Sequence, residues 1–333
     1  MSRDGASGAV TEHGGRLAAA RLLFPGAPEP FLDLSTGINP RPYHLPRFPA
    51  DAFTRLPEPE ALWELQTIAA AAYGAASPEM VAAAPGTQIL ISLLPNLLPW
   101  RDVAVLGPTY AEHALAWQAA GARVTVAESL EALAGHEVAV LCNPNNPDGR
   151  RHGRDALAGL AGRVRLLVVD ESFADFEGPE RNAAPLLPRP DLLVLRSFGK
   201  SYGLAGLRLG FALAEPALAA RLRAALGPWA VSGPALAVGI PALRDRNWLM
   251  EAARRCAVDA LRLDMLLAQA GFRILGGTSL FRLASHEAAP EWFARLGQAG
   301  ILVRQFRDPA AWLRFGLPGD EAGWARLEAA FRG

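Results

Sequence analysis

The sequence predicts an α/β protein with a large domain, in which helices cover a mostly parallel sheet, and a smaller α+β domain. From residue 103 to residue 213, short apolar runs alternate with helical patterns, which is typical of parallel strands joined by helices. After Gly227-Pro228 this alternation stops, and a long helical pattern is followed by closely spaced strands. A chain of 333 residues is long enough to bury a core in each of two domains.

In the first part of the chain, the apolar runs have the length of strands and are bounded by polar residues, glycine or proline. They predict strands at 103–106, 123–126, 138–142, 165–169, 192–195 and 209–213. The segments between them have helical spacing and predict helices at 88–98, 112–120, 154–161 and 216–226.

The second part of the chain has a different order of elements. It predicts a long helix at 247–270, strands at 272–275, 280–283, 301–303 and 312–315, and helices at 290–299 and from residue 321. The proline-rich segment 25–59 is expected to be irregular and to cross over to this part. We therefore expect an N-terminal arm and loop packed with the small domain (1–40), a large domain (41–233) and a small domain (234–333).

The composition narrows the class of protein. Formal net charge is zero and no basic stripe stands out, which argues against nucleic acid or a membrane surface as a partner. The two cysteines, Cys142 and Cys256, form neither a disulfide framework nor a metal-type Cys/His spacing. Residues 1–15 lack the apolar core of a signal peptide, and apolar runs end well before membrane-spanning length. We expect a cytoplasmic protein without a bound metal.

Lysine occurs once. Of the 33 Lys and Arg residues, only Lys200 is a lysine, within Ser197-Phe198-Gly199-Lys200-Ser201. One interpretation is a coding bias toward arginine, in which case Lys200 is an ordinary surface lysine that was not replaced by arginine. Alternatively, Lys200 is a Schiff-base residue, because an ε-amine with a lowered pKa can attack a carbonyl and a guanidinium cannot.

Other polar residues follow predicted strands, at the sheet edge where ligands bind in such folds. Pro85-Gly86-Thr87-Gln88 opens a helix and is either an ordinary N-cap or an anion site. The segment from Cys142 to Gly149 is rich in Asn and Pro and is at least a turn. Asp170 ends an apolar strand, where a buried carboxylate needs a cationic partner, and a protonated cofactor ring nitrogen is one candidate.

Two arginines complete the set of candidates. Arg208 follows Lys200 by eight residues and has the chemistry to bind a phosphate with two hydrogen bonds. Arg314 lies in the strand-like run Trp312-Leu313-Arg314-Phe315 and is either a buried ion-pair partner or a clamp for a carboxylate.

The order of these motifs resembles the fold-type I pyridoxal-phosphate enzymes over nearly the whole chain. The resemblance rests on the Asn-Pro turn, the strand ending in Asp, Ser-x-x-Lys with Arg eight residues on, and the late Leu-Arg strand. Asn145-Asn146-Pro147 and Leu204-Ala205-Gly206-Leu207-Arg208 are similar to the histidinol-phosphate aminotransferases and to the related threonine-phosphate decarboxylases.

This resemblance implies pyridoxal 5'-phosphate as cofactor and a role for each motif. Lys200 would form the Schiff base, Asp170 would pair with the ring nitrogen, and Tyr110 would stack on the ring. Asn146 would bind the phenolic oxygen. The cofactor phosphate would be held by Gly86, Thr87, Gln88, Ser197 and Arg208, and by Tyr73 from the neighbouring subunit, which implies a homodimer.

The same resemblance bears on the reaction and its substrate. Phe173 stands where the aminotransferases usually have a tyrosine, and Asp-Glu-Ser-Phe is similar to the decarboxylase pattern. Arg314 would bind the substrate carboxylate, His13-Gly14-Gly15 the substrate phosphate, and Asn39 lies in a loop that would cover the site. The alternative for His13 is a histidine in a disordered tail.

Decarboxylation of L-threonine O-3-phosphate to (R)-1-amino-2-propanol O-2-phosphate and carbon dioxide, which supplies the aminopropanol linker of cobalamin, is therefore the predicted reaction. The alternative is a histidinol-phosphate aminotransferase or a related amino-acid aminotransferase, since the torsion that selects the broken bond at Cα cannot be obtained from a sequence. A regulator of this fold without enzymatic activity is disfavoured, because the chain has neither spare length nor a basic patch.

Overall fold

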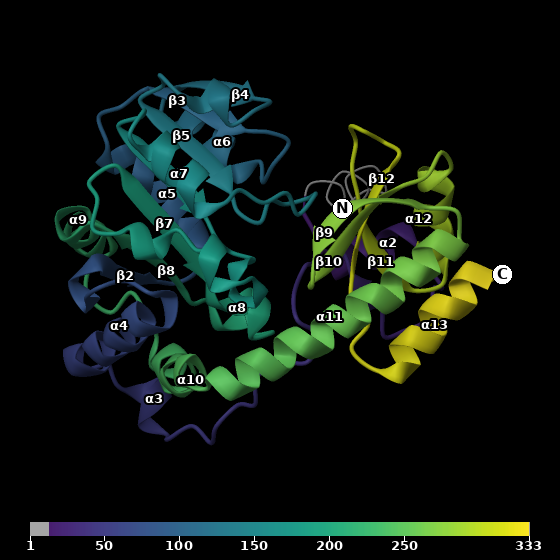
Figure 1. Ribbon diagram of the computed structural model, residues 1–333. Coiled ribbons are helices and arrows are strands. Elements are labelled where there is room, and N and C mark those ends of the chain that lie inside the picture. Colours follow the sequence, from purple (N-terminus) through teal and green to yellow (C-terminus); the bar gives the residue numbers. More distant parts are fainter. Residues whose placement is uncertain (1–12, 333) are drawn as a thin grey trace. The chain divides into compact units, whose positions relative to one another are not determined.

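The computed structural model describes residues 13–332, which divide into two compact units (Figure 1). The large unit comprises residues 42–146 and 150–250. The small unit comprises the described residues up to Arg41, residues 147–149 and the chain from Glu251 onward.

A seven-stranded sheet in the order β2-β8-β7-β6-β5-β3-β4 forms the centre of the large unit. The five strands from β7 to β4 are parallel to their neighbours, whereas β8 is antiparallel to both β7 and β2. The strands are β2 (Val81–Ala84), β3 (Asp102–Leu106), β4 (Arg123–Ala127), β5 (Val138–Cys142), β6 (Leu166–Asp170), β7 (Leu192–Ser197) and β8 (Gly210–Ala214).

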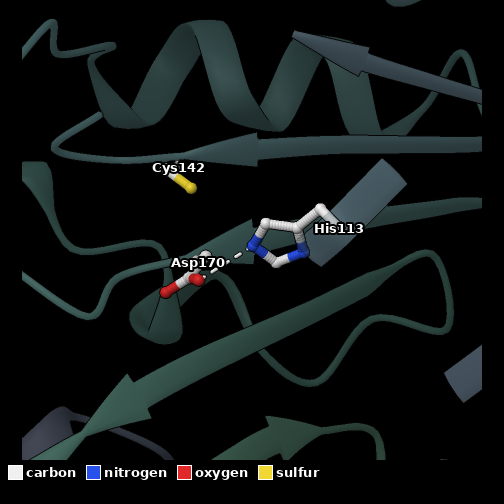
Figure 2. Close-up of side chains that lie close together, drawn as sticks. All are labelled: His113, Cys142 and Asp170. Carbon is white, nitrogen blue, oxygen red and sulfur yellow. Dashed lines mark hydrogen bonds and ion pairs between the residues drawn. The ribbon is translucent and has the colours of Figure 1, made fainter. Parts of the chain in front are cut away.

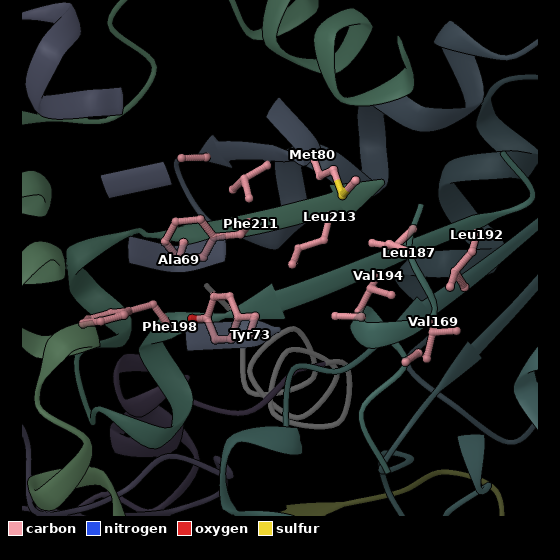
Figure 3. Packing of buried hydrophobic residues seen from close by; sticks show 14 of the residues in the cluster. Ala69, Tyr73, Met80, Val169, Leu187, Leu192, Val194, Phe198, Phe211 and Leu213 are labelled. Atoms are coloured by element: carbon pink, nitrogen blue, oxygen red, sulfur yellow. The ribbon is translucent and has the colours of Figure 1, made fainter. Parts of the chain in front are cut away.

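Helices cover both faces of this sheet, which is why its central strands are apolar along their length. Successive strand residues alternate between the two cores: Val169 and Val194 pack on the face with α4 and α10, and Val168 and Leu195 on the face with α5 and α9. Figure 3 shows part of the first core. The helices are α3 (Asp51–Thr54), α4 (Pro59–Tyr73), α5 (Thr87–Leu97), α6 (Glu112–Ala119), α7 (Arg154–Ala161), α8 (Phe198–Ser201), α9 (Pro216–Leu226) and α10 (Gly233–Arg244).

The small unit contains a five-stranded sheet in the order β1-β11-β12-β10-β9. β1 comes from the N-terminal segment and is parallel to β11, and the other pairs are antiparallel. The strands are β1 (Leu32–Leu34), β9 (Arg273–Thr278), β10 (Phe281–Ser285), β11 (Ile301–Gln305) and β12 (Trp312–Gly316), and the helices are α2 (Leu17–Leu23), α11 (Arg246–Gln269), α12 (Ala289–Gln298) and α13 (Glu321–Arg332).

The large unit continues beyond residue 233, where the sequence-based division ends it. Ser232 caps α10 by accepting a hydrogen bond from the Ala235 N–H, and α10 packs on α4. Leu236, Val238 and Leu243 of α10 lie in the first core of the large unit. The Gly-Pro break at 227–234 is therefore a turn between two helices of one unit, and the division falls after Met250.

Among residues 13–332, no helix combines the length and the apolar character that crossing a membrane requires.

Candidate active site

One pocket of the large unit lies where β5, β6 and β7 end and α5 begins. Parallel strands bring the residues that follow them to one edge of a sheet, so segments far apart in the sequence meet there. The structure brings together nine of the ten residues for which a cofactor contact was predicted, and all nine line this pocket: Gly86, Thr87, Gln88, Tyr110, Asn146, Asp170, Ser197, Lys200 and Arg208.

One end of the pocket has the features of an anion site. Gly86, with φ +88°, precedes the first turn of α5, and a Cβ built on it would lie 2.4 Å from Nη2 of Arg208. Arg208 itself has φ +56°, which is costly for a residue with a side chain and is typically maintained at functional sites. The guanidinium and the free N–H groups of the helix N-terminus are thus held next to each other.

Asp170 also lines the pocket and is buried. Its Oδ1 accepts hydrogen bonds from the Ser172 backbone N–H at 2.9 Å and the Ser172 hydroxyl at 2.5 Å, and its Oδ2 lies 2.9 Å from Nε2 of His113 (Figure 2). Burial opposes ionisation of Asp170, but the hydrogen bond and charge of His113, together with Ser172, lower its pKa below the usual value. Asp170 is therefore an anion that already has one cationic neighbour.

His113 is the partner of Asp170 that the sequence analysis did not identify. Burial favours the neutral imidazole, but Cys142 and Asp170 outweigh this effect and raise the pKa of His113 to about 10. A positional signal was available, because His113 follows Tyr110 by three residues and lies at the start of α6, directly after the loop that carries Tyr110.

This raised pKa predicts a pH-dependent stability. The pKa of a histidine in an unfolded chain is about 6.5. Below that pH, the stabilisation from charged His113 is complete. It is lost as the pH rises through about 10. Urea unfolding of the wild type and His113→Gln should show a difference in unfolding free energy that shrinks between about pH 6 and pH 10. A difference that stays constant over this range would contradict the charged state of His113.

Lys200 is held in the short helix α8, directly after β7, with its side chain half-buried in the pocket wall. Its Nζ lies 5.7 Å from the ring centroid of Phe173, which also lines the pocket. The phenyl ring offers a face to the ammonium group but no hydroxyl donor. Phe173 therefore makes one side of the lysine environment apolar.

Tyr110 and Asn146 are positioned by two loops that bind each other. The Thr109 hydroxyl donates to Oδ1 of Asn145 at 2.7 Å, and Nδ2 of Asn145 donates to the Pro108 carbonyl at 2.9 Å. The Tyr110 hydroxyl donates to Oε1 of Gln88 at 3.0 Å, and burial raises the Tyr110 pKa to about 12. Tyr110 is thus a neutral aromatic side chain with a fixed ring.

The prediction for Tyr73 is wrong. Its side chain is buried at the end of α4, within the core of the large unit, and Figure 3 shows it close to Phe198 and Phe211. The guanidinium of Arg196 lies 4.5 Å from its ring centroid. A tyrosine with 4 % exposure cannot reach the cofactor of a neighbouring subunit.

Arg196, Glu171 and Asp175 form a buried ion triad directly behind the pocket. Nη1 of Arg196 donates to Oε2 of Glu171 at 2.7 Å, and Nη2 donates to Oδ1 of Asp175. All three side chains are nearly inaccessible to solvent. The chain neighbours of this triad, Asp170 and Ser197, line the pocket, so the triad fixes the strand ends that carry them.

The residues predicted to bind the substrate belong to the small unit. Gly14 and Arg314 meet there through Ser35, which the sequence analysis did not single out. Nη2 of Arg314 donates to the Ser35 carbonyl at 2.8 Å, and a Cβ on Gly14 would lie 2.4 Å from the same oxygen. Burial and the nearby Arg304 lower the pKa of Arg314 to about 10, with Asp33 opposing them.

His13 and Asn39 also belong to the small unit. His13 is exposed, and Asn39 is buried, where its Oδ1 accepts hydrogen bonds from the Arg41 N–H at 3.0 Å and from Cys256 at 3.6 Å. What His13, Gly14, Asn39 and Arg314 bind stays a prediction.

Comparison with known proteins identifies the family. The sequence model of the aminotransferase class I and II family matches residues 50–330. The chain belongs to this family. Within the class I and II aminotransferase family, it is 44% identical over 331 residues to a threonine-phosphate decarboxylase of Pseudomonas aeruginosa, covering 97% of this chain and 98% of the relative. A threonine-phosphate decarboxylase of Sinorhizobium sp. is 42% identical, with 96% of both chains covered.

A solved structure agrees with the class I and II aminotransferase fold. Histidinol-phosphate aminotransferase from Sinorhizobium meliloti, in complex with pyridoxal-5'-phosphate, aligns with a TM-score of 0.77 over 85% of this chain and 84% of that one. At 23% identity this similarity supports the fold alone. The predicted fold-type I architecture is thereby confirmed.

Proposed function

We propose that the protein is a pyridoxal 5'-phosphate-dependent decarboxylase that converts L-threonine O-3-phosphate to (R)-1-amino-2-propanol O-2-phosphate and carbon dioxide. The observation that carries this proposal is the similarity, over nearly the full length of both chains, to two threonine-phosphate decarboxylases. Removal of the carboxylate leaves the aminopropanol phosphate from which the linker of cobalamin is made.

The pocket fits pyridoxal 5'-phosphate by its donor set. It combines a cradle for an anion at Gly86 and Arg208, an ionised carboxylate at Asp170, an aromatic ring at Tyr110 and an amine at Lys200. Arg208, Ser197 and the start of α5 would hold the phosphate, and Asn146 the phenolic oxygen. When bound, this cofactor supplies an electron sink for the electrons left at the substrate Cα.

Each side chain contributes to binding, orientation or proton transfer. Asp170, fixed by Ser172 and His113, would keep the ring nitrogen protonated. Lys200 would hold the cofactor covalently, and its amine would be the group that delivers a proton to Cα. Phe173 would shield the lysine from water on one side.

The substrate is a small phosphorylated amino acid. We assign its carboxylate to Arg314, because a buried guanidinium beside another arginine favours an anion. His13 and Gly14 would bind its phosphate, and the Asn39 loop would cover it. A homodimer and a cytoplasmic location belong to the same proposal, now without Tyr73 as the residue that crosses between subunits.

The anion cradle gives a direct test of cofactor binding. In Gly86→Ala, the new Cβ meets the Arg208 guanidinium and strains a backbone at φ +88°. We expect the apparent Kd for pyridoxal 5'-phosphate to rise about tenfold or more, measured by fluorescence titration of the cofactor-free protein. Gly206→Ala is the matched control, since a Cβ there meets nothing within 4 Å. Equal affinities of both variants for pyridoxal 5'-phosphate would show that Gly86 is not part of the cofactor site.

The reaction is tested with two substrates in parallel. Purified protein should release carbon dioxide from L-threonine O-3-phosphate without any keto acid. Histidinol phosphate with 2-oxoglutarate should yield no glutamate above background. Glutamate formation without carbon dioxide release would instead establish the aminotransferase alternative.

A further inference from the structure

His113, Cys142 and Asp170 form a compact donor cluster in the pocket wall. They come from α6, the last residue of β5 and the last residue of β6, and all three are buried. Their donor atoms lie within 4.8 Å of one another. Figure 2 shows the three side chains together. The cluster is built into the sheet, because Cys142 and Asp170 are direct partners in the parallel β5–β6 register.

These donors are a set that thiophilic divalent cations prefer. Thiolate, imidazole and carboxylate are the usual ligands of Zn²⁺, and three of them with an open fourth position form a common protein zinc site. Nε2 of His113 and Oδ2 of Asp170 lie 2.9 Å apart. A small displacement of the two groups would let a cation take the place of the proton between them. Cys142 and Asp170 also line the pocket, so a water molecule has access to the fourth position.

We propose that His113, Cys142 and Asp170 bind one thiophilic divalent cation such as Zn²⁺ when the cofactor is not bound, and that cation and cofactor exclude each other. Binding releases the thiol proton of Cys142 and the proton shared by His113 and Asp170, and no electron is transferred. Exclusion follows because both ligands need Asp170 and the same pocket space. The inference does not depend on which reaction the holoenzyme catalyses.

The charged groups near the cluster have opposite effects on cation binding. Lys200 and Arg208 line the same pocket and oppose a cation. Once formed, the Cys142 thiolate and the Asp170 carboxylate place two negative charges in direct contact with the ion, and Coulomb energy falls with distance. Because binding displaces protons, the affinity should fall as the pH is lowered.

Cobalt provides a spectroscopic test on the full-length protein stripped of cofactor. Titration with Co²⁺ should reach saturation at about one equivalent and produce an intense near-ultraviolet band from thiolate-to-cobalt charge transfer. Cys142→Ser should lose this band, whereas Cys256→Ser, the matched control at the only other cysteine of the chain, should keep it. A band that is absent from the wild type, or that persists in Cys142→Ser, overturns the proposal.

A second measurement needs no variant and so cannot fail through misfolding. Zn²⁺ should slow alkylation of Cys142 in the wild-type protein at least about tenfold and leave Cys256 unchanged, as read by mass spectrometry of the two cysteine peptides. The apparent Kd for pyridoxal 5'-phosphate should rise in proportion to free Zn²⁺. Unaltered alkylation of Cys142, or a cofactor Kd independent of zinc, contradicts the site. The carbon dioxide assay of the metal-free holoenzyme is a separate result, so its failure would not bear on this inference.

Discussion

Replacing Lys200 with alanine is expected to lower the rate of carbon dioxide release by about three orders of magnitude or more. The chain contains no second lysine that could take over, so the loss should not be rescued from within the protein. The long-wavelength visible absorption of the bound cofactor should disappear together with activity. Both effects can be followed on one preparation, by absorbance and by a coupled assay for carbon dioxide.

Lys200→Arg separates the chemistry of the amine from its charge. The guanidinium keeps a positive charge near Phe173 but cannot lose a proton at neutral pH. We therefore expect Lys200→Arg to be as inactive as Lys200→Ala. Substantial activity in the arginine variant would mean that Lys200 acts only as a cation.

Replacing Arg196 with methionine is expected to lower the free energy of unfolding by about 3–5 kcal/mol. The substitution leaves Glu171 and Asp175 buried without their counter-ion, and burial already raises the pKa of Glu171 against the effect of Arg196. Urea unfolding at neutral pH measures the loss. Cofactor affinity should fall as well, because Arg196 precedes Ser197 in β7.

Two controls define the interpretation of Arg196→Met. Arg244→Met removes an ion pair with Glu64 in which both side chains are about half exposed, and should cost no more than about 1 kcal/mol. Adding Glu171→Gln and Asp175→Asn to Arg196→Met should restore part of the loss, because no uncompensated charge then remains. If Arg196→Met costs no more than Arg244→Met, the triad does not stabilise the strand ends.

The sequence located the pocket because its residues follow apolar strands. Lys200 and Asp170 each come directly after or at the end of such a run, and the topology of parallel strands brings strand ends together. No long-range contact needs to be known for this inference. The role of Tyr73 came instead from the family resemblance, and it failed because nothing local distinguishes a tyrosine that ends a helix in the core from one on an interface.

The residues that were missed depend on contacts distant in sequence. His113 is separated from Asp170 by 57 residues, and Ser35 from Arg314 by 279. α10 was missed for a related reason: the Gly-Pro break before it has the composition of a linker, and only packing against α4 shows that the chain stays in the same unit.

The ends of β6 and β7 carry two functions on opposite faces. Asp170 and Ser197 face the pocket, while the adjacent Glu171 and Arg196 pair on the side of the first core. A deletion of one residue before Arg196 in β7 would move Ser197 into the place of Arg196, putting a hydroxyl against Tyr73, and would turn the guanidinium to the opposite face of the sheet. Insertions and deletions should therefore be tolerated far less here than substitutions, and the number of residues in β7 should vary less among functional relatives than their identity.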